Sequence, residues 1–268
     1  MFDGSDTETD ELPTVSCLMV TADRRRLCRR AVRCYERQTY PNRELVVVDD
    51  GEQDLSPVLE TVPDGDLTHV QLPSEKDHVL GRLRNVALEA ATGQLMAQWD
   101  DYDWYHPNRI EKQVRTLRDG YDACCLRGTL MHVDSPRYVN RPYIGYLQDG
   151  VPGTIIHRRA PDIRYPEMRR EEDTNYLEKW KRKGRTAIAS KTHLFIRCFH
   201  GKNTWDKNHF LTRIRNTIPD AVAYVWYEYV YGDLFQHPRF QLREEDHQAF
   251  EQYLEDSIEL GLLKSNCA

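Results

Sequence analysis

The sequence predicts an α/β fold with a mostly parallel β-sheet flanked by helices and a smaller antiparallel part later in the chain. Two observations support this fold class. Short apolar runs alternate with helical patterns through the first half, as a parallel sheet with crossover helices requires. Acidic and other polar residues follow several of these runs. A chain of 268 residues, 40% apolar, is long enough to bury a full core.

The first half supplies four predicted strands and three predicted helices. The strands are expected at residues 15–21, 44–49, 67–72 and 95–99, and the helices at 24–38, 80–93 and 107–120. The run at 44–49 is apolar at consecutive positions, which is typical of a strand buried on both faces. Pro107 suits the first turn of its helix, and Gly120 suits the end.

The second half has a less regular pattern. Strand-like segments are expected at residues 123–133 and 153–158 and near Thr186 and Leu194, with helices at 171–183 and 244–263. We divide the chain into a flexible acidic N-terminus at 1–13, a main domain at 14–235 and a C-terminal helical extension at 236–268 that packs on the domain.

Composition excludes several classes of protein. A net charge of −6 argues against a nucleic-acid partner held through phosphates. No apolar stretch is long enough to span a membrane, and the first ten residues are acidic where a signal peptide would be basic, so we expect a cytoplasmic protein. Seven cysteines without Cys-x-x-Cys spacing favour small core residues over disulfides or a zinc site.

The helix predicted at 24–38 is rich in arginine. Seven arginines lie on it, at positions 24, 25, 26, 29, 30, 33 and 37. They indicate either a solvated helix face or a surface that docks an anionic lipid or a polyanionic acceptor. Docking to an anionic lipid would place the protein in peripheral contact with a membrane.

Acidic side chains gather where the predicted parallel strands end. Thr21 and Asp23 follow the first strand, Asp49 and Asp50 follow the second, and the segment after the fourth contains three acids. Those three are Asp100, Asp101 and Asp103. Ligands of open parallel sheets bind at this edge. Carboxylates 4 Å apart repel by roughly 4 kcal/mol at an effective dielectric of about 20, so the cluster indicates a bound cation. Asp23 alone could equally cap a turn.

The loop after the first strand lacks the glycine-rich pattern that cradles phosphates. Carboxylates can instead hold phosphate oxygens through Mg²⁺ or Mn²⁺. Asp50 could accept a hydrogen bond from uracil, thymine or guanine. The edge therefore indicates a nucleoside diphosphate compound as ligand.

Six segments in order resemble the family 2 glycosyltransferases of GT-A fold, over roughly residues 14–205. They are VSCLMVTAD (15–23), QTYPNRELVVVDDG (38–51), GRLRNVAL with ATG (81–93), QWDDYDWYHPNR (98–109), EEDTNYL (171–177) and FIRCFHGKNT (195–204). The resemblance implies a Rossmann-like GT-A domain. It also implies an inverting transferase that moves a sugar from a nucleotide-sugar to the hydroxyl of a glycan, lipid-linked or peptide acceptor. A UDP-sugar is the donor expected before others.

The resemblance also implies roles for single residues. Asp173 would be the general base, and Thr21, Asp23, Asp50, Arg84 and Asp100 would contact the donor nucleotide. Where the family keeps its metal-binding Asp, this sequence has Tyr102. Asp101, Asp103 and His200 are therefore expected to hold Mn²⁺ or Mg²⁺, unless metal binding is weakened. Without the resemblance, the acids at 171–173 could simply complement a helix dipole.

Two alternatives stay open. The substitution at Tyr102 favours a catalytically silent relative that binds a glycan or a partner protein. A nucleotidyltransferase would share the sheet and the metal carboxylates, but it needs the glycine-rich loop. Trp104, Trp180 and Trp205 could stack on sugars or belong to the core.

Overall fold

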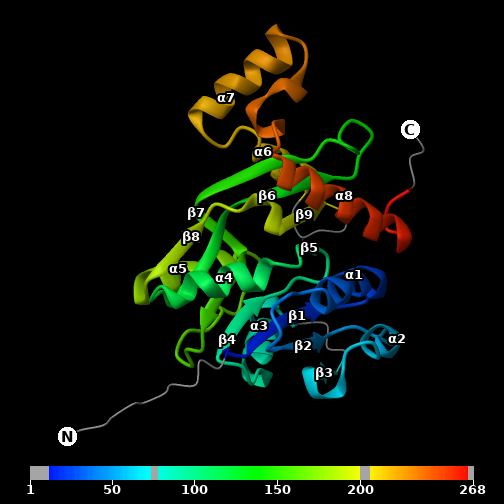
Figure 1. Ribbon diagram of the computed structural model, residues 1–268, viewed down its shortest axis with the longest axis vertical. Helices are drawn as coiled ribbons and strands as arrows, with labels where there is room; N and C mark the ends of the chain where they lie inside the picture. Colours follow the sequence, from blue (N-terminus) through cyan, green and yellow to red (C-terminus); the bar gives the residue numbers. More distant parts are fainter. Residues whose placement is uncertain (1–11, 74–77, 200–205, 265–268) are drawn as a thin grey trace, which may run out of the picture.

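The protein is described by a computed structural model that covers residues 12–73, 78–199 and 206–264. These residues form one nine-stranded sheet in the order β3-β2-β1-β4-β7-β6-β9-β5, with β8 paired to β6 (Figure 1). The expected α/β class with a mostly parallel first part and a smaller antiparallel part is confirmed.

The parallel half contains the strands that the hydrophobic runs predict. Its strands are β1 (Val15–Thr21), β2 (Arg43–Asp49), β3 (Leu67–Gln71) and β4 (Leu95–Gln98). The connecting helices are α1 (Arg25–Glu36), α2 (Ser56–Leu59), the 3₁₀ turn η1 (Asp64–Asp66) and α3 (Leu80–Ala90). β1 pairs in parallel with both β2 and β4. β2 is buried from Glu44 to Asp49 around an uninterrupted apolar run at 45–48, as a strand covered on both faces requires.

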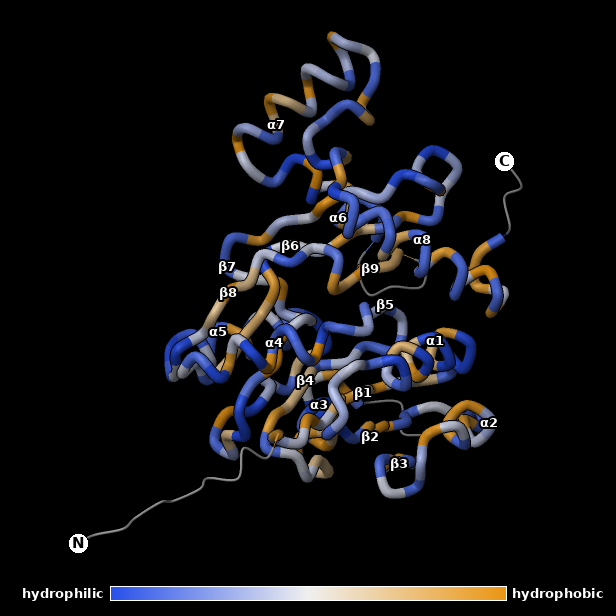
Figure 2. The backbone as a smooth tube through the Cα atoms, in the orientation of Figure 1, coloured by the Kyte–Doolittle hydropathy of each residue, from blue (hydrophilic) through white to orange (hydrophobic). Residues whose placement is uncertain are grey.

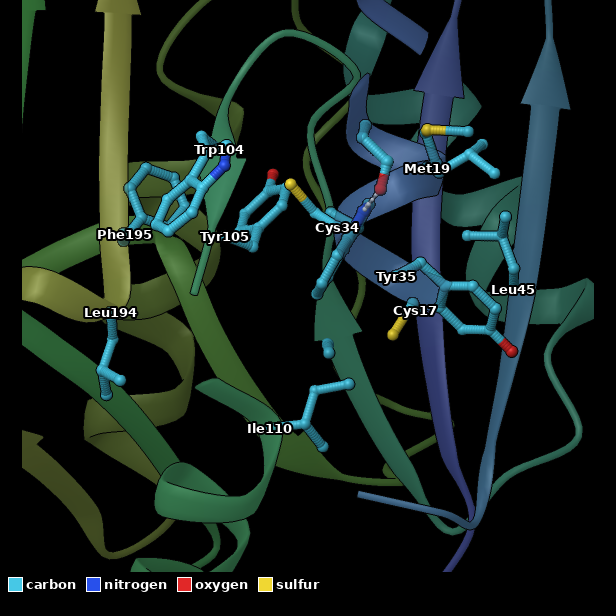
Figure 3. Close-up of a cluster of buried hydrophobic side chains, with 14 of the residues drawn as sticks. Cys17, Met19, Cys34, Tyr35, Leu45, Trp104, Tyr105, Ile110, Leu194 and Phe195 are labelled. Atoms are coloured by element: carbon cyan, nitrogen blue, oxygen red, sulfur yellow. Dashed lines mark hydrogen bonds between the residues drawn. The ribbon is translucent and has the colours of Figure 1, made fainter. Parts of the chain in front are cut away.

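The core on the α1 side of the sheet is built from strand and helix side chains together. Cys17 and Met19 of β1 and Leu45 of β2 lie beside Cys34 and Tyr35 of α1 (Figure 3). All are at most 2% exposed. The six cysteines within the described chain are free and buried, as expected for small core residues.

The second half is antiparallel around one long hairpin. Its elements are β5 (Trp104–Tyr105), α4 (Arg109–Arg118), β6 (Ala123–Val133), β7 (Tyr143–Arg158), α5 (Glu172–Lys183), β8 (Thr186–Ala189), η2 (Thr192–Leu194) and β9 (Phe195–Phe199). β7 runs antiparallel to both β4 and β6. It begins ten residues before the strand that the sequence predicts at 153–158. The register of the hairpin shifts twice near Leu126, which breaks the alternation on which sequence patterns depend.

The C-terminal part is helical. It contains α6 (Lys207–Thr212), α7 (Ile218–Val225), a π-helical turn η3 (Trp226–Val230), the 3₁₀ turns η4 (Leu234–Gln236) and η5 (Pro238–Phe240), and α8 (Glu244–Glu259). The sequence pattern predicts only the last of these helices and extends it four residues too far. The helix ends early because Gly261 adopts a left-handed φ of 66°. No helix in the described ranges is both long and apolar enough to cross a membrane.

The helix α8 packs on α1 and the loop after β4 through polar contacts. Arg30, 2% exposed, donates to the Ser257 hydroxyl and to the Tyr102 carbonyl. Asp256 accepts from the Trp104 indole (2.9 Å) and from Arg37 (2.6 Å). For Arg30 neither interpretation of the arginine-rich helix is correct, since this side chain is buried against α8, whereas Arg37 is 40% exposed on the helix face.

Two of the tryptophans considered for sugar stacking are core residues. Trp104 is 1% and Trp180 is 3% exposed, and Trp180 stacks on the His157 ring at 4.4 Å. Their faces are covered by protein, so sugar stacking is wrong for both. Trp205 lies outside the described residues.

Candidate functional site

The candidate site lies at the carboxyl edge of β1, β2 and β4, where the sequence places its acids. Thr21 is in register with Asp49 at the ends of β1 and β2. The backbone N–H of Asp50 donates to the Thr21 carbonyl (2.9 Å), which joins the two strand ends. The predicted convergence of these polar residues on one edge therefore occurs.

Asp101 is bound tightly by two neighbours at this edge. The Thr21 hydroxyl donates to its Oδ2 (2.7 Å), and the Arg24 guanidinium donates to its Oδ1 (3.0 Å). Asp101 is 1% exposed, and burial raises its pKa to about 6 even though Arg24 and Thr21 act in the opposite direction. The Arg24 guanidinium also lies 5.7 Å from the centre of the Tyr102 ring, within cation–π range.

A second cluster joins the end of β4 to two helices. Arg84 of α3 donates to Oδ1 of Asp100 (2.8 Å) and to Oε1 of Glu172 in α5 (3.2 Å). The side chains of all three residues are at most 10% exposed. Arg84 also lies 5.7 Å from the centre of the Tyr165 ring. A buried arginine with two carboxylates fixes the position of α5 relative to the strand ends.

Asp173 has a different environment from the adjacent Glu172. It is half-buried, and its Oδ1 accepts hydrogen bonds from the backbone N–H and the hydroxyl of the adjacent Thr174. It is close enough to Arg84 that its charge helps to raise the pKa of that guanidinium. Glu171, just before the helix, has φ of 63°, which is uncommon for a residue other than glycine. The turn therefore leaves Asp173 accessible while Glu172 points into the buried cluster.

Asp50 and Asp23 are both engaged within the protein. Asp50 Oδ1 contacts the His78 ring Nδ1 at 2.5 Å. Asp23 Oδ1 accepts from the backbone N–H groups of Glu52 (2.8 Å) and Gln53 (3.0 Å). Asp23 thus performs the turn-capping role that was the alternative to nucleotide binding. Its contact with a nucleotide, and that of Asp50, remain predictions.

Two of the three predicted metal ligands are described, and they point in different directions, while the metal centre itself stays a prediction. Asp103, 2% exposed, accepts from the backbone N–H of Cys198 (3.0 Å) and points toward β9, whereas Asp101 points toward Thr21 and Arg24. Burial and the Asp100 charge raise the pKa of Asp103 to about 8, which favours a neutral carboxyl. Within the described chain no group of three or more His, Cys, Asp or Glu side chains could hold a metal ion. His200 lies outside it.

Three residues of this site are not predicted from the sequence. The sequence places Glu172 only beside Asp173, and it indicates no role for His78 or Tyr165. His78 and Asp50 are 28 residues apart, and Glu172 and Arg84 are 88 apart. No local pattern marks such pairs. The one available signal was that a buried Arg84 needs more than one carboxylate partner.

This sheet, with its polar edge at the parallel strand ends and its antiparallel extension, defines a GT-A-type fold. Residues 16–199 match the model of glycosyl transferase family 2. The chain belongs to that family.

The chain is also similar to individual proteins. It is 32% identical over 113 residues to "Putative glycosyltransferase EpsH" of Bacillus subtilis (strain 168), a match that covers 42% of this chain and 33% of EpsH. The chain therefore spans about a third of that relative.

Two solved structures share the fold at 17% identity. S. aureus TarS 1-349 in complex with UDP has a TM-score of 0.58, with 94% of this chain and 84% of TarS covered. The mannosyltransferase PcManGT of Pyrobaculum calidifontis, in complex with GDP-Man and Mn²⁺, has a TM-score of 0.55, with 96% and 77% covered.

Proposed function

We propose that this protein transfers a sugar from a nucleotide-sugar to an acceptor hydroxyl with inversion at the sugar carbon. The observation that carries the proposal is the pairing of a buried Arg84 cluster with an accessible Asp173 next to it. Support comes from the family, and from the UDP and GDP-Man complexes of structures with the same fold. A UDP-sugar is the first donor to test, and a glycan, lipid-linked or peptide hydroxyl the acceptor.

In the proposed reaction Asp173 is the general base. Its carboxylate takes the proton of the acceptor hydroxyl, whose oxygen attacks the sugar carbon in line with the departing diphosphate. The base must lie on a different element from the groups that hold the diphosphate, and α5 satisfies this requirement. Glu172 is a positioning residue because its bond to Arg84 fixes the start of α5.

Positive charge for the diphosphate comes from arginines in this proposal. Arg84 is bound to Asp100 and Glu172 but keeps guanidinium donors beyond those two bonds. Arg24 is 35% exposed beside Asp101 and can reach a ligand at the rim. The predicted Mn²⁺ or Mg²⁺ would need Asp101 and Asp103 to turn toward one point, so no step of this proposal passes through a metal.

The test is a comparison of transfer and donor binding in Asp173→Asn. We expect unchanged calorimetric binding of the preferred UDP-, dTDP- or GDP-sugar and a loss of turnover of about 10²- to 10⁴-fold. The matched control is Glu178→Gln, which removes a carboxylate from the same helix at a solvent-facing pair with Lys181. Unchanged turnover in Asp173→Asn would remove this residue as the base.

A second candidate function is a binding protein without transferase activity. The engagement of Asp50 by His78 and of Asp101 by Arg24 favours it, because both acids already have partners inside the protein. Donor binding without hydrolysis or transfer, across the same set of nucleotide-sugars, would support this function. Release of pyrophosphate would instead indicate nucleotidyl transfer.

A further inference from the structure

A helical projection at one end of the molecule has no buried residue. It consists of α7 (Ile218–Val225) and the π turn that continues it (Trp226–Val230), both of which lie wholly within the described part of the chain. Figure 1 shows α7 standing apart from the parallel strands, beyond the β6–β7 hairpin. A helix of this length is marginal in water unless one face is covered.

Most large apolar residues of this projection are exposed, as is Tyr231 directly after it. The stripe that they form, with exposed fractions in parentheses, comprises Ile218 (83%), Val222 (66%), Val225 (54%), Trp226 (53%), Tyr229 (74%), Val230 (63%) and Tyr231 (62%). The first five are spaced as i, i+4, i+7, i+8 and i+11, which is the pattern of one helix face. In a surface helix this face normally points into the core. Here it points into solvent, and apolar positions recur along α7 in Figure 2.

Two of the three acids near the stripe are paired with arginines of the same protein, and the third, Asp233, accepts from the backbone N–H of Phe235 (3.0 Å). Asp220 is bound by Arg239 (Nε to Oδ1, 3.0 Å), and Glu228 is bound by Arg137 (2.6 Å). Residues 216–238 contain no lysine or arginine. An interfacial membrane helix usually carries basic residues on its polar face, so an anionic membrane is a poor partner. A surface with an identical, uncharged stripe meets no like-charge repulsion.

The area of the stripe also fits a specific protein partner. Its three aromatic side chains, of about 150–250 Å² each, and its four aliphatic ones together expose on the order of 600–800 Å². This is close to the share that one partner contributes to an interface of standard size, about 800 Å². It exceeds the largest apolar patch of a typical monomer, about 300–600 Å².

We propose that the occupant of this stripe is the same stripe of a second copy of this chain. The two α7 helices pack across a two-fold axis, so that each copy offers the same surface to the other. The Asp220–Arg239 and Glu228–Arg137 pairs hold the projection in place before association, which lowers the entropic cost of binding. This proposal is independent of the reaction that the protein catalyses.

The experiment is sedimentation equilibrium of the full chain over a range of concentrations. We expect the wild type to have twice the 31.6 kDa mass of the chain and Val222→Glu to have the monomer mass. Val222 is 66% exposed, so the substitution leaves the core intact, and an unchanged circular dichroism spectrum verifies this. The matched control is Ile258→Glu, which adds the same charge at an apolar residue of α8 that is 40% exposed, and it should remain a dimer.

Three results would overturn the proposal. They are a wild type that stays monomeric at the highest concentration, a Val222→Glu variant that still dimerises, and a monomer that floats with neutral phosphatidylcholine vesicles. A cross-link adds a positional test. Val222→Cys in a Cys267→Ser background should form a covalent dimer with a short bismaleimide, whereas Glu255→Cys, on the exposed side of α8, should not.

Discussion

Two arginines bind carboxylates at the same edge of the sheet, but their environments differ. The Arg84 side chain is 7% exposed and bridges two carboxylates from different elements. The Arg24 side chain is 35% exposed and binds one. If Arg84 moved away, two carboxylates would remain buried without a cation. Arg24 has one partner and is partly exposed, so it can exchange Asp101 for a ligand. We infer that Arg84 must keep both carboxylates to support the fold and can offer a ligand only its remaining donors, whereas Arg24 is free to exchange its partner.

The largest expected effect comes from Arg84→Met. The substitution leaves Asp100 and Glu172 buried without their cation, so we expect a loss of about 3–5 kcal/mol in the free energy of unfolding. Urea denaturation measures it. Arg164→Met is the control, because Arg164 is 39% exposed and lies 3.7 Å from Glu89, a surface pair worth about 0–1 kcal/mol. Equal losses in the two variants would remove the distinction between buried and exposed arginines.

A buried histidine without a carboxylate partner extends the comparison of buried and exposed basic side chains. His157 is 2% exposed, and within the described chain its ring nitrogens contact the Tyr176 hydroxyl and the Arg158 carbonyl rather than a carboxylate. Burial lowers its pKa from 6.5 to about 4. Because the folded-state pKa is depressed, the stability is complete above pH 6.5 and falls as the pH drops toward 4, by about 3 kcal/mol.

The measurement is the free energy of unfolding at several pH values for the wild type and for His157→Asn. The variant should be less stable at pH 7 but should lose less stability between pH 6.5 and 4. Other groups titrate in this range, including Asp101, so only the difference between the two proteins is informative. Parallel curves for the two proteins would contradict the neutral state of His157.

The smallest effect on stability is expected for Arg24→Gln. Its ion pair is partly exposed, so unfolding should change by less than about 1 kcal/mol. Donor affinity should fall about tenfold, because a charge-assisted hydrogen bond to the diphosphate is lost. Calorimetry in Mn²⁺ and in EDTA should give the same ratio of affinities. A wild-type affinity that depends strongly on Mn²⁺ would show that Asp101 and Asp103 turn away from their present partners.

The parallel half could be predicted from the sequence, whereas much of the second half could not. β1 and β2 are short, apolar and followed by polar turns. The local pattern therefore shows both that these segments are strands and where each strand ends. β7 has register shifts and polar residues near Asp149, so it lacks a regular period. The helix α7 has no fully buried residue, and its apolar pattern does not indicate that one face is left exposed.

The same limit applies to the candidate site. Sequence spacing located Asp100, Asp101 and Asp103 on one loop, but it could not show that Asp103 turns toward Cys198 and β9 while Asp101 turns toward Thr21. Direction depends on donors that come from distant parts of the chain. Side-chain type and position were therefore predictable, and side-chain orientation was not.

The contact of α8 with the loop after β4 links the acidic edge of the sheet to the last helix of the chain. Ser257 and Asp256 reach back to that loop through Arg30, which binds the Tyr102 carbonyl, and through the Trp104 indole. The shape of the loop thus depends on residues that leave the ribosome about 150 positions later. The loop therefore reaches its final shape only when the last helix docks, so we expect a chain shortened before that helix to lose the observed arrangement of the loop.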